Sequence, residues 1–416
     1  MSDASQSEDF GKFDETVIRV VGVGGGGGNA VNRMIESGNM QGVQFIAINT
    51  DAKDLLRSEA DIKISLSDET SRGLGAGADP ERGAKAAQDH QADIEEALKG
   101  SDMVFVTCGE GGGTGTGASP LVAHIARELG ALTVAVVTRP FSFEGPRRAE
   151  SAKLGIEKLR KEVDAIIVIP NDRLLQMTDT NVTLLDAFST ADTALNDGVE
   201  GITDLVNGGS YIDADFNDVK TILKDSGTAL FGIGQARGDD RAIKAAELAI
   251  NSPLLEQSIE GAHGALVHIT SSNDITLNEV AAATELVRKV VSPEAQIIWG
   301  QGFDDSYGDD VKVTVIAAGF DDNQMNPPDQ GTRDQGLPFN QDDADESTAA
   351  QEPVERRPQV PTINPIHLNN HVEFEQPLQE QTPVQPAPAA QTPVQPASVE
   401  EEDDTTGDID IPPFLR

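Results

Sequence analysis

The chain has 416 residues, a single cysteine and a formal net charge of -39. This length allows two domains of ordinary size with a sizeable buried core. The net charge disfavours binding to nucleic acid or to anionic lipid surfaces. Cys108 has no partner for an intramolecular disulfide, and no segment approaches the roughly 20 apolar residues needed to cross a bilayer. We therefore expect a soluble cytoplasmic protein that neither binds nucleic acid nor inserts into membranes.

Acidic residues are spread along the whole chain rather than gathered in one block. This pattern is typical of proteins that stay soluble in concentrated salt, and it predicts a halophilic source. An ordinary acidic mesophilic protein is the alternative. Stability that falls when salt is removed would distinguish the two.

The chain begins with a polar, acidic segment, residues 1–15, which lacks the features of a signal peptide and is expected to be disordered. From Thr16, short apolar runs alternate with amphipathic stretches. Runs rich in Val and Ile, separated by helix-length segments, are typical of strands buried on both faces of a parallel sheet. They predict a doubly wound, Rossmann-like α/β domain over residues 16–180. The predicted strands are Val17–Val23, Val43–Asn49, Met103–Cys108, Leu132–Thr138 and Ala165–Pro170.

The first predicted strand leads into five consecutive glycines, Gly24 to Gly28, with Asn29 at the start of a helix. Glycines let backbone amides approach a phosphate, and a helix N-terminus adds partial positive charge. The pattern alone is ambiguous, because Gly22, Gly24 and Gly27 fit GxGxxG and Asp51 follows the second strand. A nicotinamide-dependent dehydrogenase is therefore the first alternative.

A second glycine-rich segment follows the strand that ends at Cys108, directly before a helix expected at Ala118. Two such segments at neighbouring strand ends can hold a triphosphate from both sides, with threonine hydroxyls as further donors, whereas a dinucleotide fold needs only one. No GxxxxGK[ST] motif occurs and neither segment contains lysine, so Mg²⁺ must carry much of the phosphate charge. The segment comprises Gly111, Gly112, Gly113, Thr114, Gly115, Thr116 and Gly117.

Apolar residues at helical spacing predict one long helix over Asn181–Val206, which connects two domains and ends at Gly208 and Gly209. A smaller α+β domain with a mixed sheet is expected over residues 210–320. Its predicted strands are Thr228–Gly234, Ala265–Thr270, Gln296–Gly300 and Val311–Ala317, and its predicted helices are Asp239–Ile250 and Leu277–Val291.

Composition changes after Phe320, where most of the 22 prolines lie among Gln, Asp, Glu and Ala. Such a segment cannot bury enough apolar surface to offset its chain entropy, so residues 321–407 are predicted to form a disordered linker. Hydrophobic residues return in 408–416. An apolar peptide on a flexible tether is typical of a docking motif.

The sequences GGGTGTG and GGGGGNAV resemble the FtsZ branch of the tubulin superfamily, and the likeness runs from Thr16 to Phe320. The terminal DIPPFLR resembles that family's tail peptide, which docks membrane adaptors. The resemblance implies a GTPase domain, a long connecting helix, a C-terminal activation domain and a disordered tail. It also implies a protein that polymerises head to tail, hydrolyses GTP and forms the cytokinetic ring at midcell. The docking residues would be Asp410, Ile411, Pro412, Phe414, Leu415 and Arg416.

The same resemblance assigns the nucleotide site. Ala76 and Gly77 would face the γ-phosphate, and Glu144, Arg148 and Asn171 would lie at the ribose and neighbouring phosphate. Phe188 would stack on the base, while Asp192 and Asn29 would contact guanine. A carboxylate can accept from the ring N–H and the exocyclic amine of guanine, which favours GTP over ATP. The phosphate contacts would come from Gly25, Gly26, Gly27 and Gly28 and from the second glycine-rich segment, Gly111 to Gly117.

The resemblance places catalysis between subunits, where Asp215 and Asp218 would enter the next subunit's pocket and polarise the attacking water. Asp213 is a departure, because the family has asparagine there. Two like charges about 4 Å apart repel by roughly 4 kcal/mol at an effective dielectric of about 20, so we expect salt-dependent assembly and slower turnover. A neutral loop substitution is the alternative at Asp213.

The expected ligands are GTP or GDP and Mg²⁺, with K⁺ as a further candidate. The histidines show no spacing typical of a zinc site, so no protein side chain is assigned to a metal. The expected partners are further copies of the chain, a membrane adaptor and a candidate paralogue. Besides the dehydrogenase, a filament scaffold of the same family that does not hydrolyse GTP stays open, as does a role in cell shape rather than division.

Overall fold

The computed structural model describes residues 16–38, 40, 42–67, 73–175, 183–206, 212, 214–255 and 257–320. The predicted N-terminal extension, linker and docking peptide lie outside these residues, as does Asp213. No helix among the described residues is long and apolar enough to cross a membrane.

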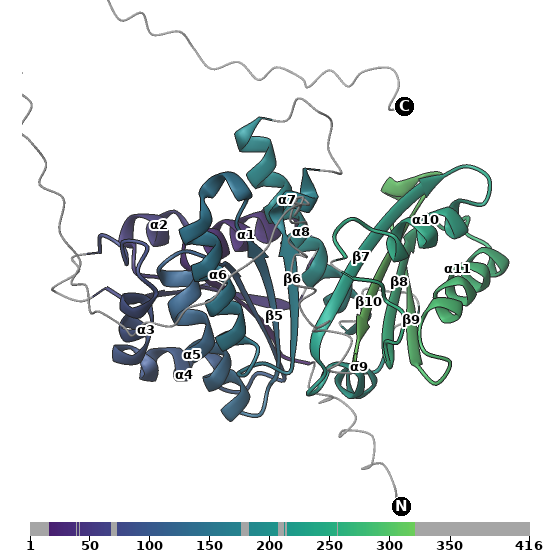
Figure 1. The fold of residues 1–416 in the computed structure, drawn as a ribbon. Coiled ribbons are helices and arrows are strands. Elements are labelled where there is room, and N and C mark those ends of the chain that lie inside the picture. Colours follow the sequence, from purple (N-terminus) through teal and green to yellow (C-terminus); the bar gives the residue numbers. More distant parts are fainter. Residues whose placement is uncertain are drawn as a thin grey trace, which may run out of the picture. The chain divides into compact units, whose positions relative to one another are not determined.

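The described residues form one ten-stranded sheet with the order β3-β2-β1-β4-β5-β6-β7-β10-β8-β9 (Figure 1). The first six strands are parallel, as the apolar runs predicted. The strands are β1 Ile18–Val23, β2 Val43–Asn49, β3 Ile62–Ser65, β4 Met103–Gly109, β5 Leu132–Arg139, β6 Ala165–Pro170, β7 Gly227–Arg237, β8 Gly264–Ser271, β9 Gln296–Phe303 and β10 Asp310–Ala318.

Helices cover both faces of the parallel half because successive strand residues point to opposite sides. On one face Val20 and Phe105 belong to a core shared with α1, α8 and α9. On the other face Val21 and Val106 pack with α3, α4, α5 and α6. The helices are α1 Gly24–Ser37, α2 Ala52–Arg57, α3 Pro80–Asp89, α4 Gln91–Leu98, α5 Thr114–Glu128, α6 Pro146–Leu159, α7 Asn171–Leu174, α8 Leu184–Val206, α9 Phe216–Leu223, α10 Arg241–Ile250 and α11 Leu277–Val290.

The C-terminal strands form a mixed sheet, as predicted, but that sheet is not separate. β7 pairs in parallel with β6 through Gly227, Thr228 and Ala229, and its later residues pair antiparallel with β10. A strand of 11 residues is long enough to have one neighbour at its start and another along the rest of its length. The two halves of the structure therefore share one hydrogen-bonded sheet.

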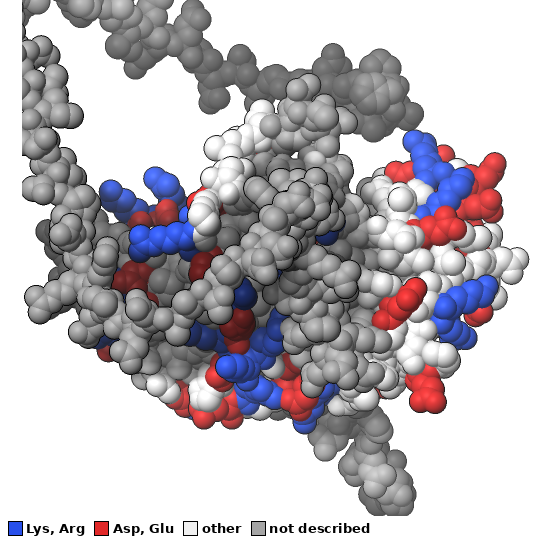
Figure 2. Space-filling view, in the orientation of Figure 1, with Lys and Arg blue, Asp and Glu red and all other residues white. Residues whose placement is uncertain are grey.

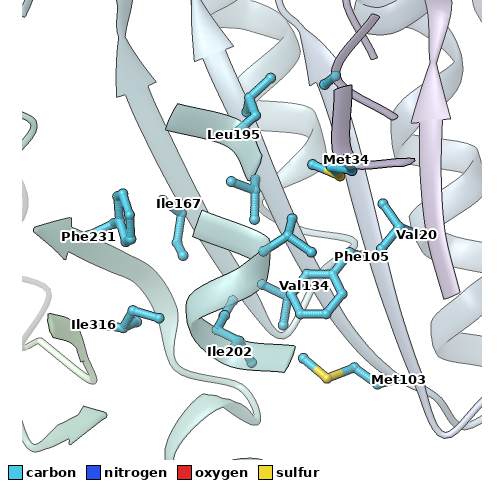
Figure 3. Close-up of a cluster of buried hydrophobic side chains, with 14 of the residues drawn as sticks. Val20, Met34, Met103, Phe105, Val134, Ile167, Leu195, Ile202, Phe231 and Ile316 are labelled. Atoms are coloured by element: carbon cyan, nitrogen blue, oxygen red, sulfur yellow. The ribbon is translucent and has the colours of Figure 1, made fainter. Parts of the chain in front are cut away.

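The long helix α8 lies between the two halves and belongs to their common core. Leu195 and Ile202 point from α8 among side chains from the parallel strands and from β7 and β10, including Phe105, Phe231 and Ile316 (Figure 3). On another side of α8, the Lys312 ammonium of β10 lies 3.4 Å from the Asp197 carboxylate. Apolar packing and an ion pair thus hold α8 against both halves.

Candidate nucleotide-binding site

The two glycine-rich segments lie at the carboxyl ends of β1 and β4, which are neighbours in the sheet. Both helices begin earlier than the sequence suggested: α1 begins at Gly24, and α5 begins at Thr114 rather than Ala118. Neither helix has a side-chain cap, whereas Asp51 caps α2 and Asp79 caps α3. Uncapped first-turn amides at two adjacent helix N-termini suit an anionic phosphate.

The two segments are in direct contact, which only glycine allows. A Cβ on Gly24 would lie 2.8 Å from the backbone nitrogen of Gly115, and one on Gly26 would lie 3.1 Å from that of Gly109. Gly25 and Gly26 are exposed, whereas Gly27 is buried and a Cβ there would collide with the Thr107 carbonyl. Gly27 therefore allows α1 to pack closely on the sheet.

A third segment, residues 73–79, lies against the start of α5. A Cβ on Gly113 would lie 2.8 Å from the Ala76 Cβ and 2.9 Å from the Asp79 nitrogen. Ala76 is buried by this packing, while Gly77 is exposed with a φ of 65°. The structure thus brings the predicted γ-phosphate segment to the same edge as the two glycine-rich segments.

The threonine hydroxyls of the second segment, predicted as further phosphate donors, also make contacts inside the protein. The Thr114 hydroxyl lies 2.6 Å from the Thr50 hydroxyl, and the Thr116 hydroxyl accepts a 2.8 Å hydrogen bond from the Gly111 amide. Both threonines are buried. Gly117 likewise packs against Pro80 of α3, and its amide donates to the Gly113 carbonyl. These residues shape the segment through packing and internal hydrogen bonds.

Glu144 and Arg148 form an ion pair beside the second segment. The Arg148 Nε lies 3.1 Å from a Glu144 oxygen, and the other Glu144 oxygen accepts from the Phe141 amide at 2.8 Å. A Cβ on Gly111 would collide with the Arg148 carbonyl and Cγ. The pair at the start of α6 is therefore fixed next to the predicted phosphate position.

The predicted base-contacting residues lie where α1 faces α8. The Arg33 guanidinium donates to the Ser189 hydroxyl at 2.6 Å, which ties the face of α1 that carries Asn29 to the first half of α8. Burial raises the pKa of Asp192 to about 6, and the nearby Arg33 charge acts in the opposite direction. The sequence did not single out Arg33, although it lies one helical turn after Asn29.

Phe188 and Asn171 complete this end of the site. The Phe188 ring is 40% exposed and packs edge-on against Phe141, with ring centroids 5.3 Å apart. An aromatic face left partly open in this way can stack on a base. Asn171 is buried at the start of α7, and its side-chain oxygen has no hydrogen-bond partner among the described residues.

Asp51, the residue that kept the dehydrogenase alternative open, has another role. Its carboxylate accepts from the Lys53 amide at 2.9 Å and from the Asp54 amide at 3.4 Å at the start of α2. A carboxylate used as a helix cap has fewer lone pairs left for a ribose hydroxyl.

Asp215 and Asp218 lie far from the glycine-rich segments. Both are exposed at the start of α9, where Asp215 accepts from the Asn217 amide at 2.8 Å and caps the helix. The Ala214 amide donates to the Leu205 carbonyl at the end of α8, opposite the end near α1 and α7 (Figure 1). At about 1.5 Å per residue, the part of α8 from Phe188 to Val206 alone spans roughly 27 Å. These carboxylates therefore cannot reach the glycine-rich edge of their own chain.

No group of three or more His, Cys, Asp or Glu side chains within the described part of the chain could hold a metal ion. The site presents the backbone amides of two uncapped helix starts, with the Arg148–Glu144 ion pair beside them.

Comparison with known proteins identifies the class first. Residues 17–179 match the GTPase domain of the Tubulin/FtsZ family, and residues 227–321 match the C-terminal domain of the FtsZ family. These two matches define a tubulin/FtsZ-like protein, with a GTPase domain followed by a C-terminal domain.

Comparison with solved structures identifies the family within this class. An empty FtsZ dimer from M. jannaschii is 43% identical, with 73% of this chain and 88% of that one covered and a TM-score of 0.71. A tryptophan-to-tyrosine mutant of FtsZ from M. jannaschii is 42% identical, with 74% of this chain and 92% of that one covered and a TM-score of 0.71. A GTPγS-bound CetZ2 protofilament from Haloferax volcanii shares the fold at 20% identity, with 75% of this chain and 96% of that one covered and a TM-score of 0.63. The chain belongs to the FtsZ family.

Proposed function

We propose that this protein binds GTP at the glycine-rich edge, polymerises head to tail and hydrolyses GTP at each junction between subunits. The observation that carries the proposal is the separation of the two halves of the catalytic site. Asp215 and Asp218 are exposed at one end of α8, and the uncapped helix starts of α1 and α5 lie at the other. A neighbour stacked in the same orientation would present its acids to this edge, as a heterologous interface requires.

At such a junction the uncapped amides and Arg148 bind the phosphates, while Asp192 and Phe188 bind guanine. Mg²⁺ would supply charge neutralisation at the phosphates. Asp215 and Asp218 of the following subunit orient a water that attacks the γ-phosphorus. The bond from that phosphorus to the bridging oxygen breaks, which yields GDP and phosphate and weakens the junction.

In the cell we propose a division ring at midcell, under the membrane, which a membrane adaptor holds through Asp410 to Arg416. The family membership supports the ring, and the apolar tail sequence supports the adaptor. A paralogue is a candidate co-polymer and K⁺ a candidate second cation.

Mixing two inactive variants tests the proposal. Asp192→Ala removes the guanine contact, and Asp215→Asn with Asp218→Asn removes the acids while asparagine still caps α9. Each variant alone should release phosphate at a small fraction of the wild-type rate. In an equal mixture, a junction is complete when its pocket comes from the variant without the acids and its acids come from Asp192→Ala. Random head-to-tail mixing should produce this arrangement, and so restore activity, at roughly a quarter of the junctions. Glu157→Gln, an exposed change on α6, is the matched control and should keep the wild-type rate.

Wild-type protein should also show a threshold concentration below which no GTP is consumed. Full-rate hydrolysis by dilute monomers, or mixtures no more active than their components, would refute a site shared between subunits.

A further inference from the structure

A buried carboxyl group lies directly behind the predicted phosphate segment. Glu110, between β4 and Gly111, is only 2% exposed. One of its carboxyl oxygens lies 3.6 Å from the Cys108 sulfur, and the other is buried without a hydrogen bond of normal geometry among the described residues. A Cβ on Gly155 of α6 would collide with that second oxygen. The side chain is therefore enclosed by β4, α5 and α6.

This carboxyl group is connected to the phosphate segment through one hydroxyl. The Thr116 hydroxyl accepts from the Gly111 amide at 2.8 Å, and its interaction with the Glu110 carboxyl group lowers the pKa of that group. The Glu110 amide donates to the Thr138 carbonyl at 2.9 Å, which fixes the backbone at the end of β4. A change in the protonation of Glu110 is therefore expected to change the position of the Thr116 side chain and of the Gly111 amide.

We propose that Glu110 is a positioning residue which shapes the phosphate segment in its neutral form, so that nucleotide binding is coupled to proton uptake at this side chain. The inference rests on the proposed binding of guanine nucleotide. An ionised carboxylate behind the amides would place a negative charge, poorly screened by water, close to the incoming phosphates. The protonated acid removes that charge.

The groups around Glu110 support the proposal that its carboxyl group is neutral when nucleotide is bound. Burial raises the pKa of Glu110 to about 7, although hydrogen bonds from Thr116, Cys108 and Gly111 lower it in part. The Cys108 thiol on β4 is itself buried, and burial raises its pKa well above the usual range. Beyond Thr116 opens a groove of about 1130 Å³ between α3, α5 and α6. Its charged and titratable side chains are Asp79, Glu81, Arg82, His124, Glu144, Arg147, Arg148, Lys158 and Glu162.

Titration calorimetry with GDP and the full chain tests the coupling. Binding is measured from pH 6 to pH 8.5 in pairs of buffers that differ in ionisation enthalpy, which reports the protons taken up. Wild-type protein should take up a proton on binding above pH 7. As the pH rises, its affinity for GDP should fall, in total by roughly tenfold for each unit by which binding raises the pKa of Glu110. Glu110→Gln should bind without that uptake and with a nearly flat affinity above pH 7.

Controls keep the outcomes distinct. Glu157→Gln, exposed on α6, should retain the wild-type uptake and pH profile, and Glu110→Met provides a second neutral variant if the glutamine disturbs folding. Equal proton uptake in wild-type and neutral variants, or none in the wild type, would overturn the role of Glu110. Failure of wild-type protein to bind GDP at any pH would instead refute the proposed nucleotide site.

Discussion

Asp192 illustrates how a single side chain can set a pH limit. Burial raises the pKa of Asp192 to about 6, so the carboxyl is mostly ionised at pH 7 and becomes neutral as the pH falls below 6. Only the ionised form accepts from both donors on the guanine edge. The proposed guanine contact therefore weakens toward acid, the opposite direction from the effect of Glu110.

Asp192→Asn should lower GDP affinity at pH 7 by roughly ten- to a hundredfold, because a donor left unpaired in a buried contact costs about 1–3 kcal/mol. The variant should also lose the drop in affinity that wild-type protein shows between pH 7 and pH 5. Fluorescent-nucleotide titrations at both pH values measure this, with Asp93→Asn on the exposed face of α4 as control. Unchanged affinity in Asp192→Asn would mean that the base lies elsewhere.

At this scale the sequence predicted candidate site residues but not their inward contacts. The glycines and Asp192 could be assigned from motif and resemblance, because those positions follow strand ends or a helix of predictable phase. Thr50 and Arg33 could not, since their partners Thr114 and Ser189 are 64 and 156 residues away in the sequence. Glu110 lay within the glycine motif, yet its burial depends on α6, whose packing the motif does not specify.

At the scale of elements, the contact between α5 and α6 depends on the absence of one side chain. Gly155→Ala should destabilise the protein by about 1–3 kcal/mol, as overpacking commonly does, because its Cβ would collide with Glu110 and with the Thr116 methyl group. Chemical denaturation without nucleotide measures the loss. Gly28→Ala, a helical glycine with open space around it, should be neutral or stabilising by about 0.5–1 kcal/mol.

A double-mutant cycle separates this collision from a general helix effect. In a Glu110→Ala background, Gly155→Ala should cost less, since one of the two groups it meets is gone. An equal cost in both backgrounds would show that the Glu110 carboxyl group does not fill the space at Gly155.

Element boundaries were predictable where hydrophobicity governs them and unpredictable where glycine does. Buried strands such as β6 matched their apolar runs, whereas β3, with four residues including Lys63, gave too weak a pattern. The starts of α1 and α5 were misplaced because glycine has low helix propensity, and close packing overrides that propensity here. The pairing of β7 with β6 is a long-range contact that local periodicity cannot reveal.

For the whole molecule, the net negative charge is the property expected to affect assembly most. Figure 2 shows acidic and basic side chains intermixed on the face in view, and about half of the net negative charge belongs to residues 1–15 and 321–416. Filament assembly would bring many such chains together. Their mutual repulsion is screened over about 10 Å at 0.1 M salt and about 3 Å at 1 M.

Raising KCl from about 0.1 M to 1 M should therefore lower the threshold concentration for assembly and raise the unfolding temperature. Sedimentation and thermal unfolding measure the two effects. The halophilic source expected from composition predicts the same trend in stability. A threshold that rises with salt would show that attraction between opposite charges dominates the junction instead.

The join between β6 and β7 has a mechanical consequence. Only three residue pairs connect these strands, against seven between β4 and β5. If subunits are stacked along α8, force passing through a filament must cross from one half of each molecule to the other. The short β6–β7 pairing and the side chains around α8 would carry that load. We therefore expect a bending filament to deform at this junction before it deforms elsewhere in the sheet.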